Sequence, residues 1–140
     1  MLIYFCGSMQ GGRQDAALYA SIIDELKSKY GQVLTEYVGS STAVQDELAC
    51  NSKDVHGYCV TKLSECDVVV AEVTQPSLGV GYELGRAKAM NKKILCLFRP
   101  KSGRKLSCMI DGMGNEDTIF VKYYEGQEFK DILKSFFEGL

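Results

Sequence analysis

Short apolar runs alternate along the chain with segments in which apolar residues recur every three or four positions. The first pattern is typical of strands, and of strands covered on both faces when the run is continuous; the second is typical of amphipathic helices. The apolar runs predict five strands, at residues 2–6, 33–38, 68–73, 94–98 and 118–122. The periodic segments predict helices at residues 15–30, 52–65, 81–90 and 125–138, and the polar stretch 39–53 is interpreted as a loop or a short helix.

The alternation of strands and helices predicts an α/β fold. Strands separated by helices form parallel sheets with right-handed crossovers, so we expect a single doubly wound, three-layer domain over residues 1–140 with a parallel sheet of about five strands, flavodoxin-like or Rossmann-like. In such sheets ligands bind beyond the carboxyl ends of the strands, where the strand order reverses. Candidate chemistry is therefore sought in the segments that directly follow strands.

Composition and charge narrow the class of partner. The formal net charge is −2, which argues against binding a nucleic-acid polymer, although backbone N–H groups can still bind a phosphate locally. The amino-terminal apolar segment reaches glycine at residue 7 and is too short for a signal peptide or a membrane span. We therefore expect a cytoplasmic or nuclear protein without a membrane partner.

The cysteines and the single histidine do not form a recognisable metal or disulfide pattern. The six cysteines contain no Cys-x-x-Cys pair, so we interpret them as small buried hydrophobic residues. His56 alone would have to serve a catalytic triad or a zinc site, and its neighbours suggest neither. No metal and no cofactor are expected.

A glycine-rich segment follows the first predicted strand and is the first candidate binding loop. Its glycines allow close approach of a ligand, and the helix after it directs its positive end toward an anion. Arg13 and Gln14 replace the Lys and Ser/Thr of a P-loop, and no dinucleotide motif is present, so an NTPase or NAD enzyme is not expected. The alternative is a turn that serves geometry alone. The candidate residues are Gly7, Ser8, Met9, Gln10, Gly11, Gly12 and Arg13.

A second candidate turn follows the most apolar strand. Ser77 and the N–H groups of Gly79 and Gly81 form an anion-binding turn, with Glu83 in the first turn of the next helix. Glu83 could simply stabilise the helix dipole. A carboxylate facing the same crevice as the first loop would also suit a nucleophile that attacks an anomeric carbon.

Several of these segments resemble the 2'-deoxynucleoside 5'-phosphate N-hydrolase family of the nucleoside 2-deoxyribosyltransferase superfamily. The resemblance covers nearly the whole chain and is most specific around Glu83. The segments that carry it are residues 4–8, 11–13, 67–86, 95–100 and 102–104.

The resemblance implies a reaction and a role for each candidate residue. It implies cleavage of the N-glycosidic bond of a deoxynucleoside monophosphate to free base and deoxyribose 5-phosphate, through a covalent intermediate on Glu83 that Tyr4 helps to orient. It assigns substrate binding to the first loop and phosphate binding to Ser77 and Gly79. It also implies a homodimer, in which Ser107 reaches the phosphate of the other subunit with Met109 close by.

The chain departs from this family at three positions. Cys59 stands where the family has an aspartate that assists departure of the base, Tyr37 replaces a histidine of the pocket, and Gln10 replaces an arginine. A thiol has a pKa near 8.5, roughly four units above that of a carboxyl, and is a poorer proton donor at neutral pH. Asp54 could substitute for the missing carboxyl, although it is offset by five positions.

Two alternatives to the hydrolase remain open. A deoxyribosyltransferase would pass the sugar to another base, but the serines at positions 8, 77 and 107 favour a 5'-phosphate over a free 5'-hydroxyl. A weakly active nucleotide-binding protein is the second alternative, because Cys59 removes the family's acid. Loss of general acid assistance typically lowers the rate about 10²–10⁴-fold, which need not abolish turnover.

Overall fold

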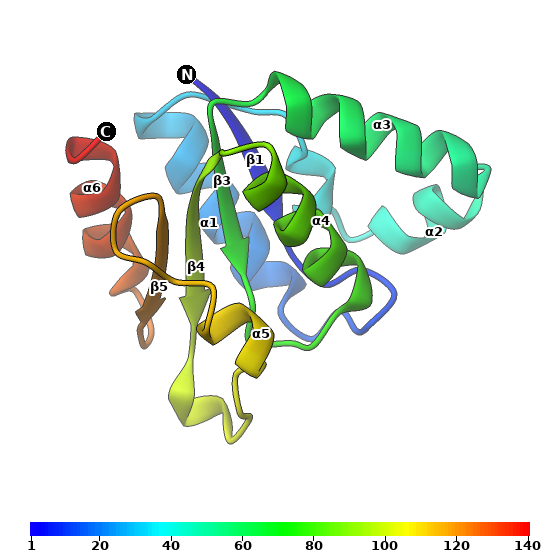
Figure 1. The fold of residues 1–140 in the computed structure, drawn as a ribbon. Coiled ribbons are helices and arrows are strands. Elements are labelled where there is room, and N and C mark those ends of the chain that lie inside the picture. The colour runs from blue at the N-terminus through cyan, green and yellow to red at the C-terminus, as the bar shows by residue number, and fades with distance from the viewer.

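Five parallel strands form one sheet in the order β2-β1-β3-β4-β5 in the computed structural model, which describes all 140 residues (Figure 1). The strands are β1 (Leu2–Cys6), β2 (Gln32–Val33), β3 (Val68–Glu72), β4 (Lys93–Phe98) and β5 (Ile119–Tyr123). The helices are α1 (Ala16–Lys29), α2 (Ala43–Leu48), α3 (Ser52–Glu65), α4 (Leu78–Ala89), α5 (Cys108–Asp111) and α6 (Phe129–Glu138), with 3-10 turns η1 (Glu36–Gly39) and η2 (Pro100–Ser102). The predicted doubly wound α/β fold is confirmed.

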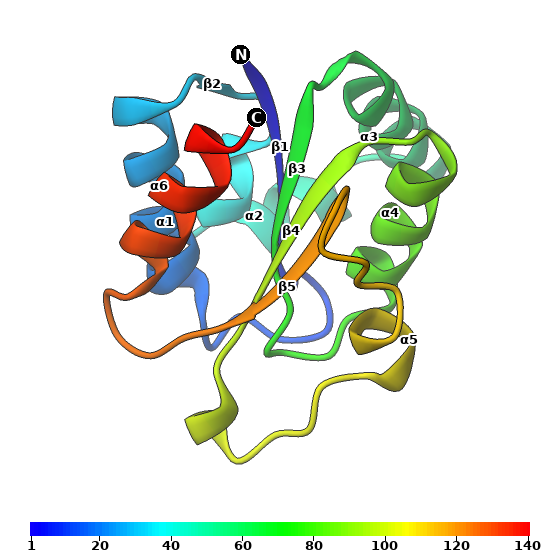
Figure 2. The same cartoon turned by 60° about the vertical axis from the view of Figure 1, so that its left-hand side comes forward.

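Helices cover the sheet on both faces, as Figure 2 shows, with α1 and α6 on one side and α3 and α4 on the other. Successive side chains of a strand point to opposite faces, so Ile3 and Phe5 pack under α1 while Tyr4 and Cys6 face the α3–α4 layer. All five residues of β3 are buried, which explains the apolar run over its first four residues, before Glu72. The alternation therefore places Tyr4 on the same side as α4.

The predicted strand at residues 33–38 is wrong over most of its length. The last main-chain hydrogen bond to β1 runs from the amide of Leu34 to the carbonyl of Ile3 at 2.8 Å, and η1 follows. The hydroxyl of Thr35 explains the change, because it accepts a hydrogen bond from the amide of Phe5 at 2.8 Å and donates to the carbonyl of Phe5 at 2.7 Å. A side chain thus takes the place of the next rung of the ladder, and the chain is free to turn.

The helix bounds differ in ways that matter for the site. Helix α3 matches its prediction, whereas α4 begins at Leu78 instead of residue 81, because Ser77 caps it by accepting a hydrogen bond from the amide of Val80. Helix α6 begins only at Phe129, and the stretch 39–53 contains α2. Glu83 consequently lies in the second turn of α4 instead of the first.

The prediction of buried cysteines holds for only half of them. All six thiols are free; Cys6 in β1, Cys96 in β4 and Cys66 at the end of α3 are buried. Cys50 and Cys108 are exposed, so the interpretation was wrong there, because Cys50 lies in the turn between α2 and α3 and Cys108 at the start of the short helix α5, both outside the core.

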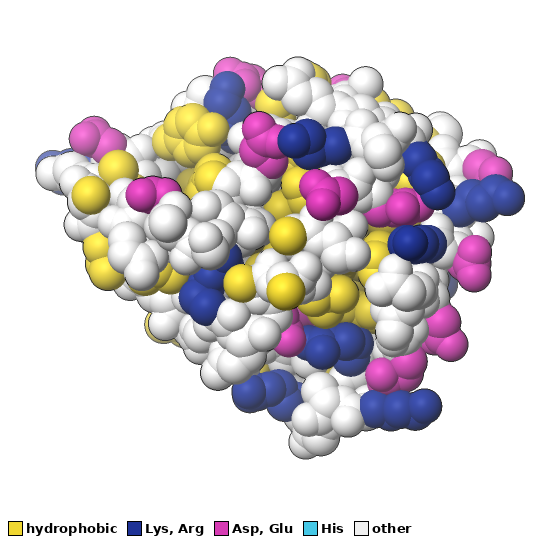
Figure 3. Space-filling view, turned by 180° about the vertical axis from the view of Figure 1, so that it is seen from behind, with side chains coloured by type: hydrophobic (Ala, Val, Ile, Leu, Met, Phe, Trp, Pro, Cys, Tyr) yellow, Lys and Arg dark blue, Asp and Glu magenta, His cyan; other side chains and the backbone are white.

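The two chain termini lie at the amino end of the sheet, opposite the loops that follow β1 and β3 (Figure 1). No helix has both the length and the apolar content needed to cross a membrane. On the face seen in Figure 3, acidic and basic side chains are interspersed without a large region of one sign. A ligand site is expected at the carboxyl ends of the strands, because ligands bind there in open parallel sheets.

Candidate active site

The strand order reverses between β1 and β3, and a cavity opens there at the carboxyl ends of the strands. Its volume is about 600 Å³, and it is lined by the loops after β1 and β3, by η1 and α2, and by α3 and α4. Among the predicted site residues it brings together Gly7, Met9, Gln10, Gly11, Ser77, Gly79 and Glu83.

Glu83 is the carboxylate held most specifically in this cavity. The phenol of Tyr4 donates a hydrogen bond of 2.6 Å to its Oε1 atom, and the thiol of Cys6 lines the same cavity. Burial raises the pKa of Glu83 to about 7, against the Tyr4 hydrogen bond and the neighbouring Cys6 thiol, which lower it. Burial also raises the pKa of Tyr4 well above its ordinary value, so this phenol stays protonated and keeps donating.

The first loop offers backbone amides to the cavity region. The amides of Met9, Gln10 and Gly11 have no acceptor within the chain, which leaves them available to an anion. A Cβ atom on Gly11 would lie 2.8 Å from the carbonyl oxygen of Pro76, so only glycine lets the two loops come this close. Gly12 has φ of +136°, a conformation that a side chain disfavours.

Two polar residues of this loop lie behind the cavity wall. Ser8 is fully buried; its amide donates to the hydroxyl of Tyr19 at 3.1 Å, and its own Oγ has no partner. Arg13 donates to the carbonyls of Ser8, Val38 and Ser40 at 3.0, 2.7 and 2.8 Å. The structure therefore uses Arg13 to fasten the loop to η1, and it does not place this guanidinium in the cavity lining.

The second loop ends at the amino terminus of α4. The amides of Leu78 and Gly79 have no acceptor within the chain, and the positive end of the helix adds to their attraction for an anion. The amide of Gly81 donates to the carbonyl of Ser77 at 3.1 Å, so the prediction that it is free for a ligand was wrong. The helix begins earlier than predicted and uses that amide in its first turn.

Ser107 and Met109 lie apart from the cavity that contains Glu83. They line a neighbouring hollow of about 620 Å³, which shares Gly11, Ser77, Leu78 and Val80 with the cavity. Ser107 caps α5 by accepting a hydrogen bond from the amide of Met109 at 3.2 Å. Within one chain the structure does not bring Ser107 to Glu83.

The wall opposite Glu83 is formed by η1, α2 and α3. Cys59 lines the cavity there, and its Sγ lies 3.6 Å from the hydroxyl of Tyr37. Asp54 faces an adjoining hollow of about 370 Å³ and does not line the cavity, so the structure does not support it as a substitute for the family aspartate. The carboxylate that does line this wall is Glu47, on α2.

Sequence reasoning missed two residues of this region. Glu47 accepts a hydrogen bond of 2.8 Å from the side-chain amide of Gln10, and the charge of Glu47 raises the pKa of Glu83. The side-chain amide of Gln75 donates a hydrogen bond to the carbonyl of Gly11 at 2.8 Å and joins the two loops. Gln75 lies within the most specific segment of the chain, whereas Glu47 lies in a polar stretch that carries no pattern. No three His, Cys, Asp or Glu side chains gather as a metal site.

Comparison of the sequence with known proteins identifies the family of this chain. The sequence profile of the nucleoside 2-deoxyribosyltransferase family matches residues 3–119. The 5-hydroxymethyl-dUMP N-hydrolase of Danio rerio is 52% identical over 141 aligned positions that cover 100% of this chain and 98% of the relative. The human protein of the same name is 51% identical over 98% of this chain and 79% of its own length.

The structural comparison agrees on the fold. The CMP N-glycosidase of Clostridium botulinum superposes with a TM-score of 0.73 over 96% of this chain and 99% of its own, at 19% sequence identity. Identity this low shows the fold alone. The family profile and the full-length relatives decide the assignment, and the chain belongs to the nucleoside 2-deoxyribosyltransferase family.

Proposed function

We propose that this protein hydrolyses the N-glycosidic bond of 2'-deoxynucleoside 5'-monophosphates with Glu83 as the nucleophile. The observation that carries the proposal is the Tyr4–Glu83 pair at a cavity that Ser77 and Gly79 also line. The relatives named above are about half identical to this chain, and their names specify a deoxynucleoside monophosphate as substrate.

The cavity walls suggest how such a substrate would lie. The free amides of the first loop and of Leu78 and Gly79 form the anion-binding end, which suits the 5'-phosphate. Cys59 and Tyr37 form the opposite wall, which we assign to the base. The deoxyribose then lies between these ends, with C1' toward Glu83.

The reaction proceeds by two displacements at C1'. The ionised Glu83 forms a bond from carboxylate oxygen to C1' while the bond from C1' to the base nitrogen breaks, and the base leaves with that electron pair and takes up a proton from solvent. Water then attacks C1' and loses a proton to solvent, the carboxylate leaves, and deoxyribose 5-phosphate is released with retained configuration. Tyr4 keeps one oxygen hydrogen-bonded, which orients the other.

We further propose that the active form is a homodimer in which Ser107 contacts the phosphate bound by the other subunit. Leu78 is 96% exposed and Met109 82% exposed, and both line the hollow that contains Ser107. Large exposed apolar side chains gathered in one place are typical of a protein interface. A partner chain over this hollow would cover them and bring its own residues near Ser77.

Base release from a panel of substrates tests the function. We expect release from deoxynucleoside 5'-monophosphates, with kcat/KM lower by orders of magnitude for the corresponding nucleosides. Glu83→Gln and Glu83→Ala should abolish turnover while the monophosphate still binds, measured by calorimetry. Glu138→Gln, an exposed change on α6, serves as the control.

Two results would contradict the proposal. If both Glu83 variants keep more than a few per cent of wild-type turnover, Glu83 is not the nucleophile. Equal activity on a nucleoside and its monophosphate, with transfer to an added base, would instead favour a deoxyribosyltransferase.

A further inference from the structure

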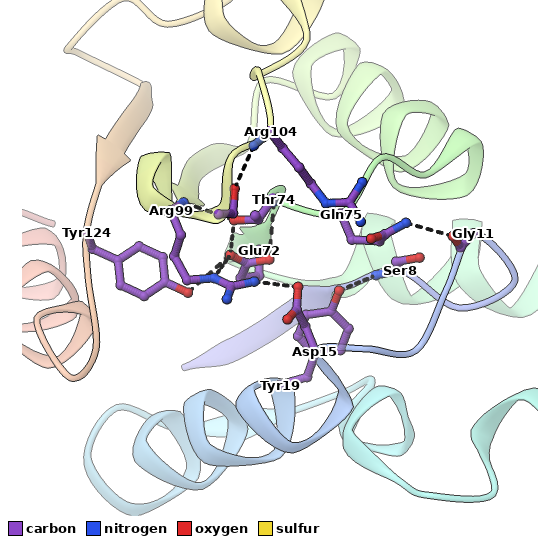
Figure 4. Close-up of polar contacts among 11 residues, drawn as sticks. Ser8, Gly11, Asp15, Tyr19, Glu72, Thr74, Gln75, Arg99, Arg104 and Tyr124 are labelled. Carbon is purple, nitrogen blue, oxygen red and sulfur yellow. Dashed lines mark hydrogen bonds and ion pairs between the residues drawn. The ribbon is translucent and has the colours of Figure 1, made fainter.

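Glu72 is a fully buried carboxylate that does not line the cavity. At the end of β3 it accepts hydrogen bonds from the Thr74 amide at 3.2 Å, the Thr74 hydroxyl at 2.5 Å, the Tyr124 hydroxyl at 3.1 Å and Nε of Arg99 at 3.3 Å (Figure 4). A buried charge survives only when it is paired and hydrogen-bonded, and this set of donors meets that need. The proposed chemistry uses none of these groups directly.

Arg99, at the end of β4, extends the network toward the first loop. One edge of its guanidinium contacts Glu72, and Nη2 pairs with the carboxylate of Asp15, as Figure 4 shows. Asp15 is the residue before α1 and lies two positions after Arg13, the last residue of the first loop. The backbone amide of Arg99 also donates to the Thr74 hydroxyl at 2.9 Å.

Glu72 is therefore linked to both loops, to the second directly and to the first through Arg99 and Asp15. Through Thr74 it holds the start of the second loop, where the Gln75 amide bonds the Gly11 carbonyl. Through Arg99 and Asp15 it holds the start of α1, where the Tyr19 hydroxyl accepts the Ser8 amide. The positions of the two loops that surround the anion-binding end thus depend on one buried carboxylate.

We propose that Asp15, Glu72 and Arg99 are positioning residues that set the separation of the two loops for a 5'-phosphate. The proposal rests on the proposed function, because the phosphate is the group that both loops bind at once. Misplacement of binding groups by a fraction of an ångström to one ångström weakens a site without removing any ligand contact from it. The chain of contacts from Asp15 through Arg99 to Glu72, here called the relay, should therefore act on binding of the phosphate. It should leave the attack of Glu83 on C1' much less affected.

Asp15→Asn is the decisive variant, because the Asp15 side chain is 17% exposed and its neutralisation leaves the Glu72–Arg99 pair in place. We expect KM for a deoxynucleoside 5'-monophosphate to rise at least tenfold while kcat changes less than threefold. Activity on the nucleoside without the phosphate should stay within twofold of wild type. Arg99→Gln should give a similar or larger rise in KM, with Arg99→Lys intermediate.

A double variant and a matched control separate positioning from general damage. Asp15→Asn combined with Arg99→Gln should be no worse than the worse single variant, because both changes break one connection. Lys92→Gln is the control, because Lys92 also bonds two backbone carbonyls, those of Ser64 and Cys66, but lies at the opposite end of the sheet. It should keep the wild-type KM even if the melting temperature falls.

Each contrary result identifies which idea fails. A folded Asp15→Asn variant with wild-type KM overturns the positioning proposal, and so do equal losses on the nucleoside and the monophosphate. If the wild-type protein releases no base from any monophosphate, the proposed function fails instead. Calorimetric binding of the monophosphate to wild type and Asp15→Asn then still tests the relay, which predicts at least tenfold weaker binding to the variant.

Discussion

Tyr4 and Glu83 are joined by a hydrogen bond of 2.6 Å although 79 positions separate them in the chain. Tyr4 belongs to β1 and Glu83 to the second turn of α4, the helix that follows β3, so the strands on either side of the reversal of strand order each lead to one partner. Burial raises the pKa of the carboxyl and the phenol lowers it, leaving the value at about 7. Tyr4 thus controls how much of Glu83 is ionised at neutral pH.

Tyr4→Phe should move the acid limb of the pH profile. Wild-type kcat/KM should fall as the pH drops below about 7, because a nucleophile must be ionised. Loss of the phenol removes a hydrogen bond to the charged form, so we expect the midpoint to rise by about one pH unit. Initial rates between pH 5 and 9 measure this, and Tyr30→Phe on the far side of the sheet is the control. An unchanged midpoint would show that Tyr4 does not act on Glu83.

Glu83→Gln should stabilise the folded protein at high pH. A carboxyl whose pKa is raised from 4.5 to about 7 by folding binds its proton more tightly in the native state, so stability falls as the pH rises between these values. This amounts to about 3 kcal/mol above pH 7. Denaturant unfolding should show the variant more stable by up to that amount at pH 8 and nearly equal to wild type at pH 4.5. An advantage of the same size at both pH values would contradict the assigned pKa.

Mixing two impaired chains tests the shared site. If Ser107 acts on the other subunit, a dimer of one Glu83→Ala chain and one Ser107→Ala chain contains one intact site and one doubly damaged site. Activity should then exceed that of either parent after mixed refolding, provided that Ser107→Ala alone is strongly impaired. A fully active Ser107→Ala variant, or a monomer at the assay concentration by sedimentation, would refute the contribution in trans.

Cys59→Asp should supply the acid that the family resemblance implies at this wall. The new carboxyl would lie beside the Tyr37 hydroxyl, which now sits 3.6 Å from the thiol. We expect kcat to rise several-fold with a shifted pH profile, at a stability cost of about 1–3 kcal/mol for placing a polar group there. Cys59→Asn matches the shape of Asp and has no acidic proton to give, so it should not raise kcat. A destabilised Asp variant with unchanged kcat would mean that the site works without this acid.

Local patterns were sufficient for the fold and for the order of its strands and longer helices. The apolar run of β3 and the spacing of Val55, Cys59 and Leu63 in α3 report burial, and burial is what a sheet between two helix layers imposes on these segments. Local patterns failed at the segment after Val33. The strand ends there because of a hydrogen bond between Thr35 and Phe5, two residues 30 positions apart. A pattern of neighbours carries no such information.

The candidate residues of the site also came from the sequence, through glycine-rich turns after strands and through the resemblance around Glu83. Only the tertiary structure decided which of them meet: it joins Tyr4 to Glu83, turns Arg13 onto backbone carbonyls, and leaves Ser107 in a separate hollow. The raised pKa of Glu83 and the buried relay through Glu72 are likewise decided only by the tertiary structure. Desolvation and hydrogen bonding depend on groups brought together from distant positions, and these distances exist only once the chain is folded.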